Sequence, residues 1–194
     1  MKLIKLSIAV VTFIAILFNA EFASSQNFAS VSGIKSINLV GVDGKAGKIS
    51  LSKPVVLIFL SPECPLCKNY LPGLVKLQNS NKQITFYGIV PGKGYSLKEI
   101  KALKADYQIN FELLSDRDKE ISKYLKATTT PEVFLINTTG AITYKGMIDN
   151  WPTSLGKTRL VVTQKYLEDA ISDLLKGKIS YKETTPIGCL INDI

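Results

Sequence analysis

Two cysteines three positions apart, Cys64 and Cys67, are the residues of this chain best suited to chemistry. They lie in the stretch 61–68, directly after an apolar run over 54–60 that has the composition of a buried strand. Apolar residues at helical spacing follow, so the sequence predicts a helix that begins at Cys64. Unpaired backbone amides and the helix dipole should make the Cys64 thiol acidic and nucleophilic. Cys67, one turn further along, is placed to resolve a mixed disulfide formed at Cys64.

The spacing of the two cysteines is also compatible with a structural disulfide and with half of a metal site. A zinc site needs two more ligands at characteristic spacing, and the chain has one more cysteine and no histidine. Covalent haem attachment needs a histidine directly after Cys67, where Lys68 stands. A structural disulfide that closes so short a loop would constrain the unfolded chain only slightly. These observations favour redox chemistry and predict neither a metal nor a cofactor.

The composition predicts one folded domain and argues against binding to nucleic acid. The chain has 194 residues, of which 46% are hydrophobic and 21% charged, and it can bury one core. Its formal net charge of +8 comes from scattered lysines, without the basic runs and interleaved aromatic residues of a nucleic-acid track. We therefore expect no nucleic-acid partner. The positive surface is compatible with attraction to anionic membrane surfaces.

Residues 1–25 have the pattern of a secretory signal peptide. Lys2 and Lys5 precede an apolar stretch over 6–18, and small residues follow over 23–25. The apolar stretch is shorter than a membrane-spanning helix usually needs, so an uncleaved membrane anchor is the second interpretation. We expect a protein that is exported across the inner membrane to the periplasm of a bacterial envelope, where disulfides can form.

The remaining sequence divides into three parts. Residues 26–35 are small and polar and should form a flexible lead-in. Residues 36–178 have the pattern of one domain, in which strand-like runs alternate with amphipathic helices and β-hairpins lie near the beginning and before the last helix. Residues 179–194 form a tail that carries the third cysteine. This order predicts a mixed α/β sheet covered on both faces, with Cys64 at the carboxyl end of a strand, where open sheets place their sites.

With these features the chain resembles the thioredoxin-like superfamily, in the redoxin branch of alkyl hydroperoxide reductase and thiol-specific antioxidant (AhpC/TSA) proteins. The resemblance covers about residues 37–191. It implies a thioredoxin-like fold and a role in cell redox homeostasis through a redox-active disulfide. The alternating pattern on either side of 42–45 adds an N-terminal β-hairpin extension to that fold. The segments that carry it are 59–67, 129–134, 146–150, 166–171 and 185–191.

The resemblance assigns a role to Thr130 and Pro131. In the superfamily the corresponding Thr-Pro bond is cis and faces the dithiol. A cis proline exposes the backbone of the preceding residue for pairing with an extended substrate. We therefore expect Thr130 and Pro131 to contribute to substrate binding beside Cys64.

The residues around the first cysteine depart from thioredoxin. Glu63 stands where thioredoxin has a tryptophan, and Ile58 stands where it has a buried carboxylate, so no proton-shuttling acid is evident. Glu63 should modulate the site, because a neighbouring negative charge opposes formation of the Cys64 thiolate.

The chain matches the peroxiredoxin pattern only in part. Ser61 fits that pattern, but Leu57 occupies the place of its proline. The chain has two arginines, Arg117 and Arg159, and the sequence gives no reason to place either of them beside Cys64. Copper-delivery relatives of the fold use a histidine ligand, which this chain lacks.

The leading hypothesis is an exported thiol:disulfide oxidoreductase. Its partners would be disulfides and thiols of proteins or small molecules, and a redox partner protein. A peroxiredoxin-like thiol peroxidase with an antioxidant role is one alternative. A non-enzymatic binding module with the same fold and a passive disulfide is another.

Cys189 is the odd cysteine of the chain. One interpretation is a half-buried apolar side chain that packs with Leu190 and Ile191 against the domain. The other is an auxiliary resolving thiol, in which Gly188 lets the tail bend so that Cys189 meets Cys64 or a second chain. The sequence leaves both open.

Overall fold

A computed structural model of the chain describes residues 30–178 and 180–191. The expected signal peptide and the first part of the expected lead-in lie outside the described residues. None of the described helices is long and apolar enough to cross a membrane. The helices are η1 (Ser32–Ser36, a 3-10 helix), α2 (Pro65–Ser80), α3 (Leu97–Asp106), α4 (Glu120–Leu125) and α5 (Tyr166–Leu175).

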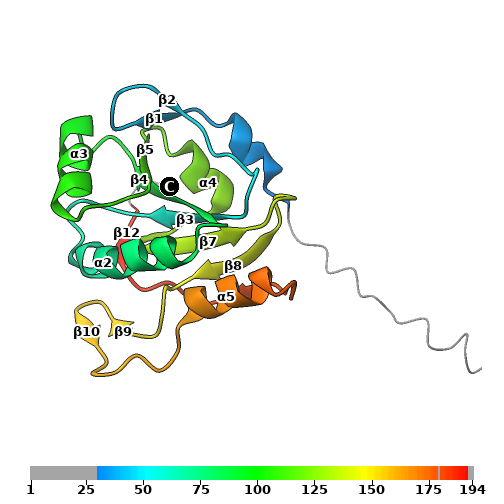
Figure 1. The fold of residues 1–194 in the computed structure, drawn as a ribbon. Coiled ribbons are helices and arrows are strands. Elements are labelled where there is room, and N and C mark those ends of the chain that lie inside the picture. The colour runs from blue at the N-terminus through cyan, green and yellow to red at the C-terminus, as the bar shows by residue number, and fades with distance from the viewer. Residues whose placement is uncertain (1–29, 179, 192–194) are drawn as a thin grey trace, which may run out of the picture.

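In the described part of the chain, a mixed sheet of eight strands lies at the centre of the molecule (Figure 1). Its strands are β1 (Leu39–Gly41), β2 (Ala46–Gly47), β3 (Val55–Phe59), β4 (Thr85–Pro91), β5 (Glu112–Asp116), β7 (Glu132–Ile136), β8 (Ile142–Gly146) and β11 (Lys182–Glu183). They are arranged in the order β11-β8-β7-β3-β4-β5-β1-β2. Strands β3, β4 and β5 are parallel, and β7 and β1 pair antiparallel with the two sides of this group.

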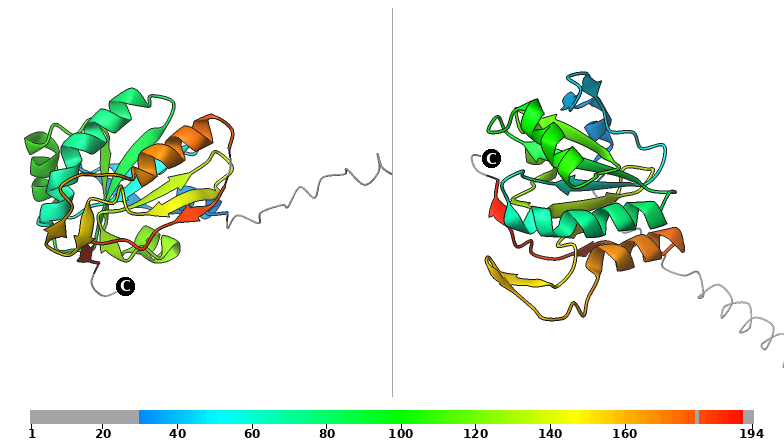
Figure 2. Two further views of the ribbon diagram at one scale, coloured as in Figure 1. Left: turned by 90° about the horizontal axis from the view of Figure 1, so that it is seen from below. Right: turned by 60° about the vertical axis from the view of Figure 1, so that its left-hand side comes forward.

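Two short antiparallel pairs lie outside the central sheet. Strand β9 (Pro152–Ser154) pairs with β10 (Lys157–Thr158), and β6 (Thr129–Thr130) pairs with β12 (Cys189–Leu190). The second pair joins the loop before β7 to the C-terminal tail. In the right-hand view of Figure 2, the red end of the tail lies beside the beginning of α2.

Strand β3 is buried on both faces because its side chains alternate between two cores. Val56 and Ile58 pack in a core shared with α2, α3 and α5. Val55, Leu57 and Phe59 pack in a second core shared with η1 and α4. Figure 1 shows α2 and α5 on one side of the sheet and α4 on the other. The predicted mixed sheet with both faces covered is therefore confirmed.

The N-terminal hairpin expected from the sequence is confirmed and belongs to the central sheet. Strands β1 and β2 pair with each other, and β1 also pairs with β5, the last strand of the parallel group. The turn between them contains Gly44, whose φ of 79° is the left-handed conformation that glycine adopts most easily. The hairpin thus extends the sheet at one edge.

The described part of the expected lead-in differs from the flexible segment that its polar composition indicated. Ser30 bridges to Ala141, and the Val31 N–H donates to the Gly140 carbonyl oxygen at 2.7 Å. Ile34 in η1 is 0% exposed and belongs to the second core. The segment is therefore bound to the domain by these backbone contacts and by the burial of two apolar side chains, Val31 and Ile34.

We expect Ile34→Ala to lower the free energy of unfolding by about 2–5 kcal/mol, because it would leave a cavity in the second core. Lys35→Ala, at the exposed neighbouring position, is the matched control and should change it by less than about 0.5 kcal/mol. Urea unfolding followed by circular dichroism measures both. Equal, small effects of the two substitutions would show that the segment contributes nothing to stability.

Candidate active site

Cys64 is the N-cap residue of α2 and follows closely on the carboxyl end of β3. Its backbone N–H donates to the Ser61 carbonyl oxygen at 3.2 Å, which closes the turn between strand and helix. Pro65 occupies the first helical position, where its fixed φ and missing N–H suit the helix start. The predicted beginning of the helix at Cys64 is confirmed, and the thiol lies at the positive end of the helix dipole.

Cys67 lies one turn along α2, on the face that packs into the first core with Leu71 and Leu74. Its side chain is completely buried, and this burial raises the pKa of the Cys67 thiol well above its ordinary value. The neighbouring Cys64 raises it further, because the protonated Cys67 thiol donates a hydrogen bond to it. In the reduced site Cys67 is therefore a protonated donor.

The Cys67 donor lowers the pKa of the Cys64 thiol to about 4. Burial of Cys64, which is only 2% exposed, acts in the opposite direction, and a hydrogen bond from Cys189 lowers the pKa again. When protonated, the Cys64 thiol donates to the Thr130 carbonyl oxygen at 3.2 Å, and this contact also favours the thiol. The donors outweigh these opposing effects, so Cys64 is a thiolate at neutral pH.

Thr130 and Pro131 lie beside the dithiol, and the peptide bond between them is cis, as the resemblance implied. Thr130 lies in β6 and is almost fully buried between Cys64 and the tail. Its carbonyl oxygen contacts Cys64, and its hydroxyl donates to the Cys189 carbonyl oxygen at 3.4 Å. The substrate-binding role expected of this pair stays a prediction.

The sequence reasoning missed Glu132, which holds the loop that carries Thr130. Its buried carboxylate accepts the N–H groups of Thr128 and Thr129 at 2.7 and 3.2 Å. Desolvation raises the pKa of Glu132, and these hydrogen bonds oppose the shift. A glutamate directly after Pro131, at the start of an otherwise apolar run, was the signal that could have identified it.

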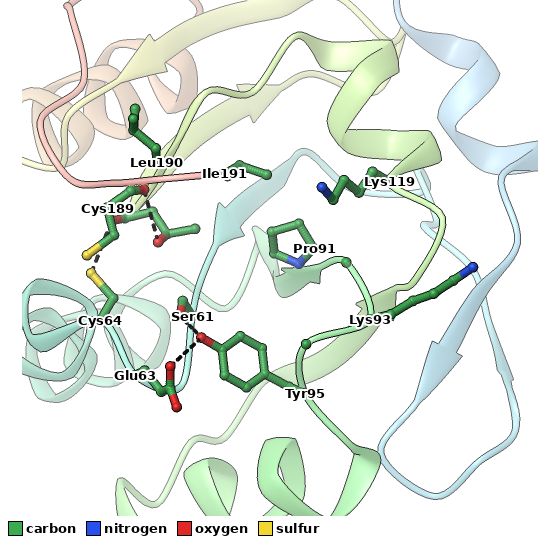
Figure 3. Close-up of a pocket in the computed structure, with 13 residues that line it drawn as sticks. Ser61, Glu63, Cys64, Pro91, Lys93, Tyr95, Lys119, Cys189, Leu190 and Ile191 are labelled. Carbon is green, nitrogen blue, oxygen red and sulfur yellow. Dashed lines mark hydrogen bonds between the residues drawn. The ribbon is translucent and has the colours of Figure 1, made fainter. Parts of the chain in front are cut away.

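A cavity of about 550 Å³ opens beside Cys64 (Figure 3). Tyr95, which the sequence reasoning also missed, lies on one wall, and its hydroxyl bonds to Ser61 Oγ at 2.8 Å. The same hydroxyl donates to Glu63 Oε2 at 3.3 Å. Glu63 thus stands at the cavity with its carboxylate turned to Tyr95, and nothing in the loop sequence around Tyr95 indicated this contact.

The tail brings the third cysteine to the site. Cys189 pairs with Thr130 in the β6–β12 ladder, and its thiol hydrogen-bonds to Cys64. Figure 3 shows the two sulfur atoms turned toward each other. Burial and the Cys64 thiolate raise the pKa of the Cys189 thiol to about 11. The structure therefore places Cys189 beside Cys64 rather than elsewhere on the surface.

Arg117 and Arg159 are not brought to the site. Neither lines the cavity, and the Arg159 Nε donates to the Asn150 carbonyl oxygen at 2.9 Å. The cations on the cavity wall are Lys93 and Lys119. Over the ranges 30–178 and 180–191, no group of three or more Cys, Asp or Glu side chains is arranged to hold a metal ion.

We expect the thiolate absorbance of the reduced protein to titrate with a midpoint near pH 4, because Cys64 alone of the three thiols has a lowered pKa. Ionised Cys64 stabilises the reduced fold. This contribution is complete above the ordinary thiol pKa of about 8.5 and is lost as the pH falls through about 4. Cys64→Ser should remove the transition, and Cys189→Ala should move it upward. A midpoint near 8.5 in the unaltered protein would contradict the assignment.

We also expect Glu63→Gln to lower the Cys64 pKa slightly, because it removes a negative charge from the adjacent residue. Glu120→Gln is the control, since it makes the same charge change in α4 on the far side of the sheet. The same absorbance titration measures both. An upward shift in Glu63→Gln would reject the modulating role.

Parts of the chain are similar in sequence to a secreted bacterial protein and to a thiol-disulfide oxidoreductase. A segment of 66 residues is 33% identical to the soluble secreted antigen MPT53 of Mycobacterium tuberculosis, covering 34% of this chain and 37% of that protein's length. Over 128 residues the chain is 24% identical to the thiol-disulfide oxidoreductase ResA of Bacillus subtilis, covering 65% of this chain and 72% of ResA.

The fold matches the crystal structure of a secreted disulfide oxidoreductase from M. tuberculosis with a TM-score of 0.58. That match has 22% identity and covers 73% of this chain and 98% of the other. It shows that the fold is thioredoxin-like. Residues 33–145, more than half of the chain, match the AhpC/TSA family, and the chain therefore belongs to that family.

Proposed function

We propose that this protein is an exported thiol:disulfide oxidoreductase that exchanges disulfides through Cys64 and Cys67. The observation that carries the proposal is a Cys64 thiolate at the start of α2, hydrogen-bonded by a buried Cys67 thiol one turn along. The similarity to ResA, named a thiol-disulfide oxidoreductase, supports it. Its substrates would be disulfides or thiols of proteins or small molecules, exchanged in turn with a redox partner protein.

The reaction follows from the different protonation states of the two cysteines. The Cys64 thiolate attacks one sulfur of a substrate disulfide, a mixed disulfide forms, and the other substrate sulfur leaves as a thiolate. Cys67 then gives its proton to that thiolate and attacks Cys64, which forms the Cys64–Cys67 disulfide and releases the second substrate thiolate. The substrate disulfide is reduced by two electrons and the dithiol is oxidised by two.

The raised pKa of Cys67 keeps the two steps in order. Part of that rise comes from the adjacent Cys64 thiolate. Once Cys64 is bound in a mixed disulfide, its negative charge is gone and Cys67 can ionise more easily. Cys67 is therefore held as a donor before the first step and becomes available as a nucleophile after it.

The structure favours disulfide exchange over peroxide reduction. Peroxidatic thiolates of related proteins work beside an arginine, and neither Arg117 nor Arg159 lines the Cys64 cavity. Cys64 has instead a second thiol within hydrogen-bond distance on the same helix. We therefore assign the dithiol to exchange, and hydrogen peroxide serves as the contrasting substrate in the test.

We further propose that residues 1–25 are a signal peptide and that residues 179–194 form a C-terminal tail, in which β11 joins the central sheet of the domain. The name of MPT53, a secreted antigen, supports export. The packing of η1 against the second core moves the beginning of the domain from residue 36 to at least residue 31.

We expect Cys64→Ser to abolish insulin reduction, because it removes the attacking thiolate. The double variant Cys67→Ser/Cys189→Ala should instead accumulate mixed disulfides with insulin chains, visible on non-reducing gels, since no second thiol remains beside Cys64 to release them. Gly73→Ala is the control, because open space surrounds its position on α2. Reduction at the parental rate by Cys64→Ser would refute the proposal. An unreactive pair would support a binding module, and rapid consumption of hydrogen peroxide would support a peroxidase.

A further inference from the structure

The C-terminal tail occupies a strand edge beside the proposed nucleophile. Cys189 and Leu190 pair antiparallel with Thr130 and Thr129, and the Ile191 N–H donates to the Thr128 carbonyl oxygen at 2.9 Å. This ladder uses the backbone that would otherwise be open to an extended chain from outside. The tail is therefore bound where a substrate strand would lie.

The side chains of the tail fit this position. Alternation along a strand places Cys189 and Ile191 on one face and Leu190 on the other. Cys189 packs against the first core and Ile191 against the second, whereas Leu190 is 74% exposed. The segment is thus held by backbone pairing and by two of its side chains.

Gly188 makes the close approach of the tail possible. A Cβ atom at this position would lie 2.3 Å from the Thr130 carbonyl oxygen and 2.8 Å from its carbonyl carbon. Both are backbone atoms of a buried residue, so they cannot turn aside as a flexible side chain would. Any larger residue at 188 would push the tail away from β6.

The docked tail places a thiol against Cys64 and covers it. Cys189 contacts the Cys64 sulfur, as Figure 3 shows, and Cys64 is 2% exposed with the tail in place. Cys189 is thus where the cysteine of a bound substrate strand would have to be. A protein substrate can reach Cys64 in this arrangement only if the tail leaves.

We propose that the tail segment 188–191 is an internal substrate of the dithiol, and that Cys189 forms a disulfide with Cys64 that closes the site to other chains. This inference rests on the proposed exchange function. It adds Cys189 as a third redox-active cysteine and the tail as a ligand of the β6 edge. It also adds a closed state of the protein, in which other chains cannot reach Cys64.

The step is an exchange within one molecule and consumes no oxidant. In the oxidised protein, the Cys189 thiol loses its proton and attacks Cys64, the Cys64–Cys67 bond breaks, and Cys67 leaves as a thiolate that takes up a proton. One disulfide and one thiol are present before and after. Attack of Cys67 on Cys64 reverses the step, and the external disulfide that first oxidised the dithiol supplies the oxidation.

The test uses the full chain carrying Cys67→Ser, oxidised with glutathione disulfide and mapped by mass spectrometry of non-reduced peptides. Glutathione should join Cys64 first, and Cys189 should then displace it to give a Cys64–Cys189 bridge in the monomer. A persistent Cys64–glutathione adduct with Cys189 free would overturn the inference while leaving the exchange function intact. A Cys189 bridge between two chains would also overturn it. A Cys64 thiol that ends neither joined to glutathione nor bridged to Cys189 would refute both.

A second experiment tests the role of the tail with the variant Gly188→Ala. Gly73→Ala is its matched control, because a Cβ at Gly73 meets nothing within 4 Å. In the Cys67→Ser protein, Gly188→Ala should slow formation of the Cys64–Cys189 bridge several-fold, because the displaced tail no longer delivers Cys189. In the otherwise unaltered reduced protein, Gly188→Ala should speed alkylation of Cys64 several-fold, because the tail no longer covers that thiol. Gly73→Ala should leave both rates unchanged. Equal rates in the two variants would show that the tail neither delivers Cys189 nor covers Cys64.

Discussion

The position of Cys64 between the start of α2 and the backbone of Thr130 is the constraint on which the rest of the site depends. A thiolate that is 2% exposed has lost most of its water, so it is stable only where protein donors replace that water. Cys67 and Cys189 are those donors, and the helix N-terminus adds to them. Each donor is fixed by a different element: Cys67 by the buried face of α2, and Cys189 by β12. The pairing of β3 with β7 fixes the helix start relative to the Thr130 loop.

The same pairing accounts for a buried carboxylate next to the site. Glu132 begins β7 opposite Phe59, where it is shielded from water. An unpaired charge there would be costly, and the Thr128 and Thr129 N–H groups offset that cost. In return, the carboxylate ties down the loop so that one residue, Thr130, contacts both Cys64 and the tail. The Glu132 carboxylate thus holds the Thr130 loop in place more firmly than the pairing of β3 with β7 alone would.

The sequence predicted the parts of the fold that depend on local pattern and missed those that depend on distant contacts. The β3 run and the helix at Cys64 follow from hydrophobic periodicity, and both are present. The packing of Ile34 was missed because two apolar residues, Val31 and Ile34, are too few to give a periodic signal in a polar segment. The place of Cys189 could not be decided, because β12 has two residues and its partner lies about sixty positions earlier.

The tail and an extended substrate would compete for the same edge of β6, and the weakness of the noncovalent ladder allows them to exchange. Its few hydrogen bonds each contribute on the order of 1 kcal/mol net. Partial burial of Cys189 and Ile191 adds less than the roughly 1.5–3 kcal/mol of a fully buried apolar side chain. Ordering each tail residue costs about 1–2 kcal/mol in backbone entropy, so the two sides nearly cancel. A bond between Cys64 and Cys189 would change that balance, because the tail could then leave only after that bond is reduced or exchanged to Cys67. The disulfide partner of Cys64 would therefore decide whether the edge of β6 is open.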